Sequence, residues 1–233
     1  PLAPIFHNLL SNNINQKFKI NFPICFLNIG GISNITKIIK KDEKLEENLE
    51  AFDSGPGNCM IDDWVRKNSN NNFDENGSIA KSGKINKLVL NQAIDNFKIN
   101  SFDKSLDVKD FDISFARGLS LEDGCATITN FTAYLIAKGI EYANGNNNKP
   151  IKYLVCGGGR KNSFLIQSIK NYLSHKQNIS LNSIDDYSLN GDYIESQAFG
   201  YLAIRSFLNL PISYPKTTGC EIPTVGGKLV KNF

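Results

Sequence analysis

The sequence predicts an α/β protein in which a mixed β-sheet is covered by helices. Two observations lead to this prediction. Short apolar runs that end at glycine turns open the chain, and from residue 120 onward such runs alternate with longer amphipathic segments. A short apolar run between turn residues is typical of a buried strand, whereas apolar residues recurring every three or four positions indicate a helix. Leading strands followed by alternating strands and helices favour one domain built on a mixed sheet.

The first half of the chain is expected to form three strands and a helix after residue 22. Residues 24–29 form a buried strand, a glycine pair turns the chain, and residues 32–39 return as the hairpin partner. After a charged turn, residues 49–53 form a third strand that ends at a Ser-Gly-Pro-Gly sequence. Asn58 then caps a helix that runs to about residue 67, with Asp62 and Asp63 on its solvated face.

The second half is expected to alternate helices and strands after an irregular insertion at about residues 68–118. Within the insertion, residues 85–97 have the pattern of a short helix. Helices are predicted over residues 121–143, 162–173 and 192–208, and strands over residues 151–156 and 179–184. The predicted order is therefore β-β-β-α, the insertion, and then α-β-α-β-α.

Composition excludes several classes of function. A chain of 233 residues that is 41% hydrophobic and 21% charged fits an ordinary globular protein with a sizeable core. The 26 Lys and Arg against 23 Asp and Glu, with no run of five bases, argue against nucleic-acid binding. No apolar run approaches the roughly 18 residues of a membrane span. Five dispersed cysteines and two histidines argue against a zinc site and favour a reducing compartment, the cytoplasm.

Glycine turns and two carboxylates mark the candidate site. Glycines cluster at three predicted strand ends, at residues 30–31, 55–57 and 157–159. Glycine lets a ligand approach the backbone, whose N–H groups can bind phosphate oxygens, although each cluster also suits a plain turn. Asp53 ends the third strand, where it either accepts a proton from a hydroxyl or water or caps the turn. Glu195 lies in the first turn of the last helix, where it either compensates the helix dipole or contacts a ligand.

The ordered set of motifs resembles the anhydro-N-acetylmuramic acid kinases almost from end to end. The motifs that carry the resemblance are PLAP with Phe6 and His7 at the start, LNIGGISNIT at 27–36, AFDSGPGN at 51–58, Phe73-Asp74, KSLD at 104–107, ATIT at 126–129, VCGGG at 155–159 with Asn162, Asp192 with Glu195, and Thr218-Gly219.

This resemblance implies a kinase of the actin and hexokinase superfamily, built from ribonuclease-H-like (actin-like ATPase) domains around a cleft. Such enzymes use ATP, Mg²⁺ and water to hydrolyse the 1,6-anhydro ring and phosphorylate the freed 6-oxygen, giving N-acetylmuramate 6-phosphate for cell-wall recycling. The resemblance implies that Asp53 is the base that activates the water. It assigns the sugar to Glu195, Asn34 and His7, although His7 lies in an apolar stretch that favours packing. It assigns the nucleotide to Gly30, Gly31, Gly55, Gly157, Gly158, Gly159 and Asn162.

The sequence lacks the opening strand and the G-T-S-x-D-G phosphate turn of the family. Residues 1–22 are therefore expected to be a lead-in from an N-terminal domain, and residues 23–233 a C-terminal actin-like ATPase domain that is inactive alone. The expected partners are the anhydrosugar and ATP, with no nucleic acid, no membrane and no protein metal ligands, and a homodimer is left open. Two alternatives stand beside this function: another sugar kinase of the superfamily, or a module that binds a nucleotide or muropeptide sugar without turnover. Retention of Asp53 favours an enzyme.

Overall fold

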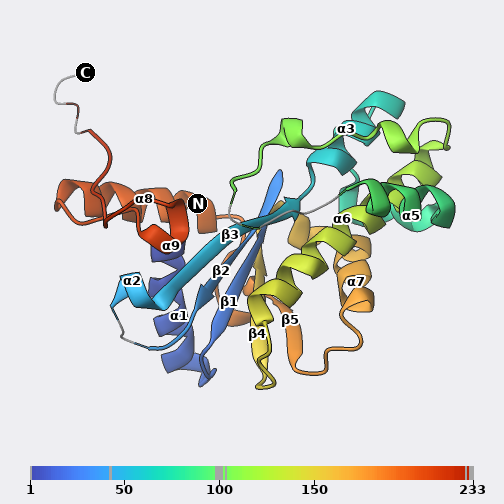
Figure 1. Cartoon of the computed structure of the whole chain (residues 1–233). Helices are drawn as coiled ribbons and strands as arrows, with labels where there is room; N and C mark the ends of the chain where they lie inside the picture. The colour runs from blue at the N-terminus through green and yellow to red at the C-terminus, as the bar shows by residue number, and fades with distance from the viewer. Residues whose placement is uncertain (1, 42–43, 98–101, 103, 229, 231–233) are drawn as a thin grey trace.

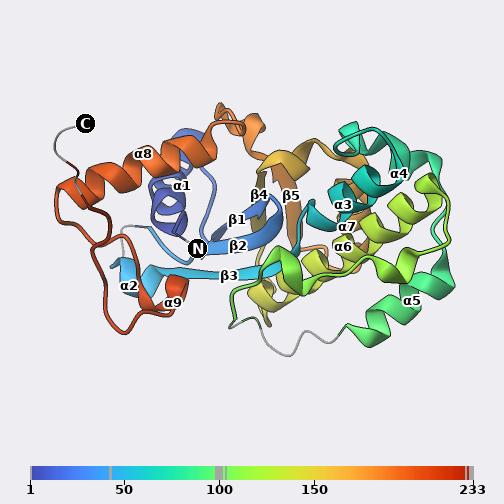
Figure 2. The same cartoon turned by 90° about the horizontal axis from the view of Figure 1, so that it is seen from above.

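A five-stranded mixed sheet lies between two layers of helices in the computed structural model, which describes residues 2–41, 44–97, 102, 104–228 and 230 (Figures 1 and 2). The strands are β1 (Ile24–Ile29), β2 (Ile32–Ile38), β3 (Leu49–Pro56), β4 (Ile151–Cys156) and β5 (Ile179–Ser183). Their order across the sheet is β3-β2-β1-β4-β5, with β2 antiparallel to both neighbours and β4 parallel to β1 and β5. The predicted α/β class and mixed sheet are confirmed, and the element order is the one expected of a ribonuclease-H-like domain.

The helices divide between the two faces of the sheet. Helices α3 (Cys59–Asn68), α6 (Leu121–Asn144) and α7 (Ser163–Tyr172) cover one face, which we call the α6 face (Figure 2). Helices α1 (Pro4–Phe18) and α8 (Ile194–Phe207) cover the other, the α8 face. The remaining helices are α2 (Leu45–Asn48), α4 (Ser78–Ser82), α5 (Lys87–Asn96) and α9 (Pro215–Thr218). Among the described residues, no helix combines the length and the hydropathy that crossing a membrane requires.

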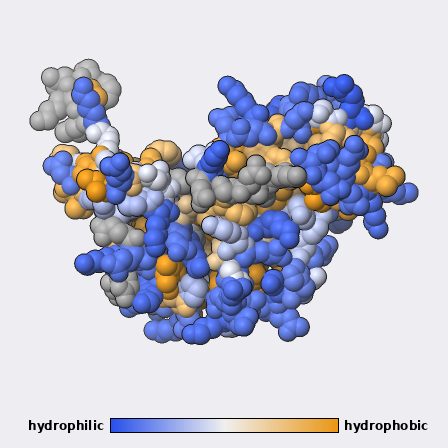
Figure 3. Space-filling model, in the orientation of Figure 1, coloured by the Kyte–Doolittle hydropathy of each residue, from blue (hydrophilic) through white to orange (hydrophobic). Residues whose placement is uncertain are grey.

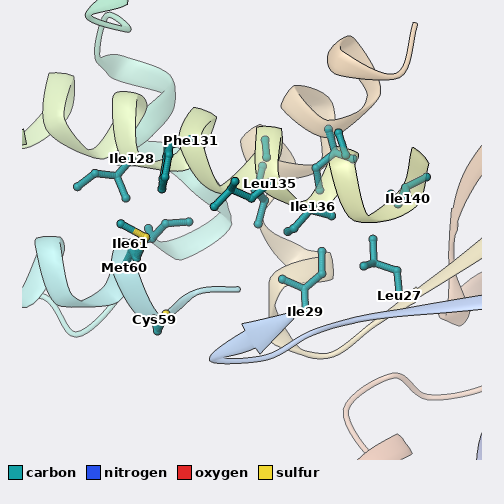
Figure 4. Close-up of a cluster of buried hydrophobic side chains, with 14 of the residues drawn as sticks. Leu27, Ile29, Cys59, Met60, Ile61, Ile128, Phe131, Leu135, Ile136 and Ile140 are labelled. Atoms are coloured by element: carbon teal, nitrogen blue, oxygen red, sulfur yellow. The ribbon is translucent and has the colours of Figure 1, made fainter. Parts of the chain in front are cut away.

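Strand alternation directs neighbouring residues of β1 into two separate cores. Leu27 and Ile29 point to the α6 face, where they pack under a row of α6 side chains that includes Leu135 and Ile136 (Figure 4). Phe26, which precedes Leu27 in the strand, points to the α8 face and packs with residues of α1 and α8. Both clusters are fully enclosed at β1, because Phe26 and Leu27 are each 0% exposed. The central strand is therefore fixed from both sides.

Helix α8 is packed less completely than α6. Its buried residues are Ile194, Ala198 and Leu202, whereas nearly every turn of α6 is buried. Phe199 and Phe207 are 62% and 68% exposed, and hydrophobic residues gather on the surface over this helix (Figure 3). The α8 face thus leaves more room around its covering helix than the α6 face does.

Residues 1–22 form more structure than the sequence analysis expected. Helix α1 occupies most of this stretch, and its Ile5, Leu10 and Ile14 are buried in the α8-face cluster. Ile5, Leu10 and Ile14 recur at helical spacing, but the many Asn residues between them have a low helix propensity, so that packing against the sheet determines the conformation of this segment. The division into a lead-in and a C-terminal domain stays a prediction.

The insertion at residues 68–118 is also more regular than expected. It contains α4 and α5, and their Ala80 and Ala93 belong to the α6-face cluster. Asp74 is only 5% exposed and accepts hydrogen bonds from the backbone N–H groups of Ile79 at 2.7 Å and Ala80 at 3.1 Å. A buried carboxylate bound in this way fixes the start of α4.

The turn between β3 and α3 differs from the prediction in two details. Strand β3 continues three residues beyond Asp53, because Gly55 and Pro56 pair with Ser33 and Ile32 of β2, and the Ser33 hydroxyl also donates to the Gly55 carbonyl at 3.0 Å. Asn58 is the N-cap residue of α3, but its side chain makes no capping hydrogen bond. The N–H groups of residues 57–59 instead donate to the carbonyls of Gly30 and Gly31, at 2.7 to 3.2 Å. The β1–β2 hairpin therefore caps α3 in place of the Asn58 side chain.

Candidate functional site

A row of polar residues crosses the sheet near the carboxyl end of β1. Strand register places Asn28 of β1 opposite Asn34 of β2, and Asn34 opposite Asp53 of β3. Directly paired residues of antiparallel strands lie about 4.5–5.5 Å apart and share a face of the sheet. Alternation from Phe26, which belongs to the α8-face cluster, puts this row on the α8 face. The row interrupts the apolar surface of that face.

A cavity of about 380 Å³ opens above this row, between the sheet and the N-terminal ends of α1 and α8. Its walls bring together the three residues that the resemblance assigns to the sugar, His7, Asn34 and Glu195, although they are far apart in sequence. Gly157 and Gly158, from the turn after β4, complete one side. We call this space the Glu195 cavity.

His7 is held rigidly in the wall of the Glu195 cavity. Its Nδ1 atom lies 2.9 Å from the Thr36 hydroxyl oxygen, and its ring stacks on Phe26 with 4.6 Å between centroids. The residue is 2% exposed, and this burial lowers the pKa of His7 to about 3. The imidazole is therefore neutral at physiological pH, so that it can bind a ligand by hydrogen bonding but not as a cation. His7 is therefore packed, as its apolar surroundings predicted, and it also lines the cavity.

A second cavity, of about 390 Å³, lies on the α6-face side of the same glycine turn. We call it the Asn162 cavity; its walls come from α3, from residues 73–76 and from the start of α7. Asn162 accepts a hydrogen bond from the Leu165 N–H at 2.9 Å and so forms the N-cap of α7. Gly158 lines both cavities. The two spaces therefore meet at a single backbone position.

Gly157 and Gly158 differ in what they demand of the backbone. The positive φ of this turn occurs at Gly157, where φ is +78° and a Cβ would lie 2.5 Å from the Asn28 side-chain oxygen. At Gly158 the nearest atom to a Cβ would be the Asn58 side-chain nitrogen, at 3.9 Å. Gly157 is therefore required by the fold, whereas Gly158 presents open backbone to both cavities.

The remaining predicted nucleotide glycines belong to the frame and line neither of these cavities. Gly30 and Gly31 accept the α3 hydrogen bonds described above. Gly55 has φ of +144° and packs on α6, where a Cβ would lie 3.1 Å from the Leu135 Cβ. Gly159 is buried, and a side chain there would overlap Ile29. The assignment of these four residues to a nucleotide stays a prediction.

Asp62 is not on a solvated face, contrary to the prediction. It lines the Asn162 cavity, and its partial burial raises the pKa of its carboxyl to about 6. Arg66 nearby lowers this pKa and the buried Asp74 raises it. The prediction failed because residues 73–76 of the insertion cover this side of α3. Asp63 does behave as expected, since it forms an exposed ion pair with Lys67 at 2.8 Å.

Asp53 lies in a third and larger cavity, of about 690 Å³, at the edge strand β3. Its Oδ2 atom accepts a hydrogen bond from the Leu106 N–H at 2.9 Å. The segment that supplies this N–H is anchored by Phe102, whose ring lies 5.1 Å from Phe52 of β3 and 4.6 Å from Tyr142 of α6, between centroids. The structure thus places Asp53 and Glu195 in different cavities. Asn34 lines the Glu195 cavity, and its partner across the strands is Asp53, which lines the larger cavity.

The cysteines and histidines form no metal site among the residues that the structure describes. No group of three or more His, Cys, Asp or Glu side chains in that part of the chain is arranged to hold a metal ion. Cys25, Cys59, Cys125 and Cys156 are buried, and burial raises the pKa of Cys156 to about 12. Such thiols stay protonated at physiological pH and are unreactive.

Comparison with known proteins assigns the family. The sequence profile of the family described as "Anhydro-N-acetylmuramic acid kinase" matches residues 1–232. The chain belongs to this family. A curated family member from Pelagibacter ubique (strain HTCC1062) is 53% identical over 236 residues, covering 100% of this chain and 60% of that protein. One from Zymomonas mobilis subsp. mobilis (strain ATCC 31821 / ZM4 / CP4) is 39% identical, covering 98% of this chain and 58% of its own length.

The chain spans about 60% of the length of these curated anhydro-N-acetylmuramic acid kinases. Among solved structures, a ligand-bound xylulose kinase from Lactobacillus acidophilus overlaps 83% of this chain and 41% of its own, with a TM-score of 0.46 and 14% identity.

Two motifs that the resemblance to anhydro-N-acetylmuramic acid kinases highlighted without a role meet at Asp53. Lys104 and Ser105 of the KSLD motif line the Asp53 cavity, and so do Thr218 and Gly219 of the C-terminal motif. These motifs are more than a hundred residues apart in sequence. The two motifs come together because each lies beside the edge strand β3. No periodicity in the sequence indicates this contact. Sequence reasoning therefore missed them as neighbours of the candidate base.

Proposed function

We propose that the protein is a cytoplasmic, ATP-dependent kinase of cell-wall recycling that opens the 1,6-anhydro ring of anhydro-N-acetylmuramic acid and phosphorylates its 6-oxygen. The observation that supports this function most strongly is the meeting of two cavities at Gly158, one lined by the predicted sugar residues and the other by predicted nucleotide residues. Phosphoryl transfer needs two ligands aligned across one point, with backbone N–H groups close by. Membership of the family supports the same reaction.

The Asn162 cavity suits the nucleotide because Gly158 carries no side chain between it and the Glu195 cavity. In this arrangement the phosphates of ATP lie at Gly158, and the capped start of α7 holds the turn in place. ATP supplies the phosphoryl group, and Mg²⁺ neutralises charge on its phosphates. Mg²⁺ is commonly bound through substrate phosphates together with one or two protein carboxylates.

Asp53 is positioned to act as the base. Its Oδ2 is held by the Leu106 N–H, which leaves its other oxygen to take the proton from a water molecule. The water oxygen then bonds to C1 of the sugar, the C1–O6 bond breaks with its electrons on O6, and O6 takes the γ-phosphoryl group as ADP leaves. Asn34 links the two ends of the sugar site, because it faces the Glu195 cavity and pairs with Asp53.

The neutral His7 and Glu195 orient the sugar in this proposal. The stacked imidazole of His7 offers a hydrogen bond without a charge, and Glu195 supplies a carboxylate from the first turn of α8. The residues of the Glu195 cavity thus select and hold the sugar, whereas Asp53 performs the proton transfer. The small-molecule partners are the anhydrosugar and ATP, and light scattering on the purified protein tests the homodimer.

A coupled ADP-release assay on the complete gene product tests the function. ADP release is expected to require 1,6-anhydro-N-acetylmuramic acid, and mass spectrometry is expected to identify N-acetylmuramate 6-phosphate as the product. Release with other sugars but not this one would instead support a different sugar kinase. Binding of ATP or the anhydrosugar by calorimetry, without any ADP release, would support a binding module.

A further inference from the structure

The guanidinium of Arg160 joins two segments that border the Glu195 cavity. Its side chain is only 5% exposed. Nη1 donates to the Gly157 carbonyl at 3.1 Å, Nε donates to Asp185 at 2.7 Å, and Nη2 donates to Asp192 at 3.0 Å. Gly157 opens the glycine turn after β4, whereas the two aspartates belong to the loop between β5 and α8. One side chain therefore contacts both sides of the cavity.

The loop of residues 184–193 wraps closely around this guanidinium. Asp185 also accepts hydrogen bonds from the Gly191 N–H at 2.8 Å and from the Ser183 hydroxyl at 2.9 Å. A Cβ at Gly191 would overlap the Arg160 side chain, so that glycine is needed for the approach. The loop leads directly into α8, whose N-cap residue Tyr193 makes no side-chain capping bond. The loop that Arg160 holds, together with the buried Ile194 and Ala198, therefore orients the first turn of α8.

Arginine suits this role because its planar group has several N–H donors in fixed directions. The Arg160 guanidinium beside Asp185 lowers the pKa of that carboxyl to about 2, and Asp192 is shifted in the same direction by Lys161 and Arg160. Both carboxylates therefore remain charged over the physiological range. The charges of Arg160, Asp185 and Asp192 therefore stay the same over this range, and the hydrogen bonds of the guanidinium have fixed directions. Both properties suit a side chain that keeps two parts of a site at a set distance.

We propose that Arg160 is a positioning residue that sets the distance between the glycine turn after β4 and Glu195, and thereby the fit of the sugar. The inference rests on the proposed function, since it assigns Arg160 to the kinase reaction without contact to the reacting atoms. Loss of the guanidinium frees the 184–193 loop, so that Glu195 samples several positions and the sugar binds less well. The glycine turn stays in place through its contacts with β1, so that the chemical step is less affected.

The test compares Arg160→Gln with Arg205→Gln in the complete gene product. Arg205 is a matched control because it also tethers α8, by donating to the Pro211 carbonyl at 2.8 Å and the Tyr214 hydroxyl at 3.2 Å, but at the other end of the helix. Arg160→Gln is expected to raise KM for the anhydrosugar at least tenfold, with a smaller fall in kcat. Arg160→Lys is expected to restore KM only in part, because lysine keeps the charge but not the planar geometry. Arg205→Gln is expected to lower the melting temperature and leave KM unchanged.

Amide hydrogen exchange gives a second readout that does not depend on activity. Arg160→Gln is expected to speed exchange at Gly191 and the rest of the 184–193 loop at least tenfold, with α6 unchanged. An unchanged KM in a folded Arg160→Gln variant, or an equal rise in KM in Arg205→Gln, would overturn the proposal. If the wild-type protein does not phosphorylate the anhydrosugar, the proposed function fails, whereas exchange at Gly191 still decides whether Arg160 holds the loop.

Discussion

The two faces of the sheet are built from the same strands but packed differently. On the α6 face, helices from three parts of the chain cover the strands with a continuous apolar cluster. On the α8 face, a smaller cluster formed with α1 and α8 stops at the row of Asn28, Asn34 and Asp53. Helix α6 is buried along its length, whereas α8 buries only three residues. The candidate sugar residues all belong to the less completely packed face.

This difference shows how one strand serves both stability and function. Alternation sends Leu27 to the core of the α6 face and Phe26 and Asn28 to the face of the site. The closely packed α6 face can keep the strands rigid. The α8 face can therefore carry polar groups at positions where apolar contacts would otherwise add stability. Changes to apolar core residues of the α6 face should therefore reduce stability with little effect on the sugar, whereas changes near the row on the α8 face should also affect the sugar.

The largest effect is expected at Asp53, on the site face. Asp53→Asn keeps the shape and an oxygen that can accept the Leu106 N–H, but it removes the base. Turnover should fall by roughly 10²–10⁴, the range that general-base catalysis contributes. The melting temperature and the KM for ATP should stay unchanged, and steady-state kinetics with thermal unfolding check both. Turnover close to wild type would make Asp53 only an anchor for the 102–107 segment.

The next prediction compares adjacent residues of β1 that face opposite ways. Leu27→Ala should cost about 2–5 kcal/mol of unfolding free energy, as other buried leucine truncations do, because both faces of β1 are enclosed. Its KM values should not change in the fraction that remains folded. Phe26→Leu should cost less, about 1–2 kcal/mol, because most of the apolar volume is kept. Urea unfolding measures both.

Phe26→Leu should nevertheless raise KM for the anhydrosugar, because the ring that stacks on His7 at 4.6 Å between centroids is lost. The KM for ATP serves as the internal control. An equal rise in KM for the anhydrosugar after Leu27→Ala and after Phe26→Leu would contradict the comparison, because it would show that both faces of the sheet affect sugar binding.

The regular elements could be predicted from the sequence where the signal is local. The strands at Ile24–Ile29 and Ile151–Cys156 have the predicted bounds, because each is an apolar run that a glycine turn ends. Helix α1 escaped because its many Asn residues have a low helix propensity, although its buried apolar residues recur at helical spacing. For the site, the sequence allowed only the prediction that glycines and carboxylates suited to a ligand lie at the ends of strands and helices.

What the sequence could not supply were distances between segments. Leu106 holds Asp53 across 53 positions, and Arg160 reaches Asp192 across 32, and no local pattern reports either contact. The distinction between Gly157 and Gly158 also depends on the β1 backbone packed against the turn, and no local pattern in the sequence reports that packing.

That distinction gives a smaller, paired prediction at the boundary of the two faces. Gly158→Val should fold, since its Cβ meets only the Asn58 side chain at 3.9 Å, and should weaken ATP binding at least tenfold, about 1.4 kcal/mol. Gly157→Ala should instead destabilise the protein by about 1–3 kcal/mol, through its positive φ and the overlap with Asn28. Calorimetry with each ligand and thermal unfolding separate the two. If Gly158→Val weakened both ligands in proportion to lost stability, the turn would be structural only.

The smallest effect concerns Asp62, a carboxyl that the α6 face buries only in part. Burial raises its pKa to about 6, above the value of about 3.9 for an unfolded aspartate, so the folded state holds a proton that the unfolded state has lost between these pH values. Stability should therefore fall as pH rises from about 4 to 6 and stay lower above 6. Asp62→Asn should remove this dependence and be more stable than wild type at pH 8, by a difference on the order of 1 kcal/mol.

Arg66 and Asp74 act on the Asp62 carboxyl in opposite directions, so burial determines the sign of the effect. Asp63→Asn is the matched control, because Asp63 is exposed on the same helix and pairs with Lys67. Urea unfolding of the three proteins at pH 4, 5, 6 and 8 measures the effect. A wild-type stability that stays constant or increases over this range, parallel to that of Asp62→Asn, would show that the insertion does not bury Asp62.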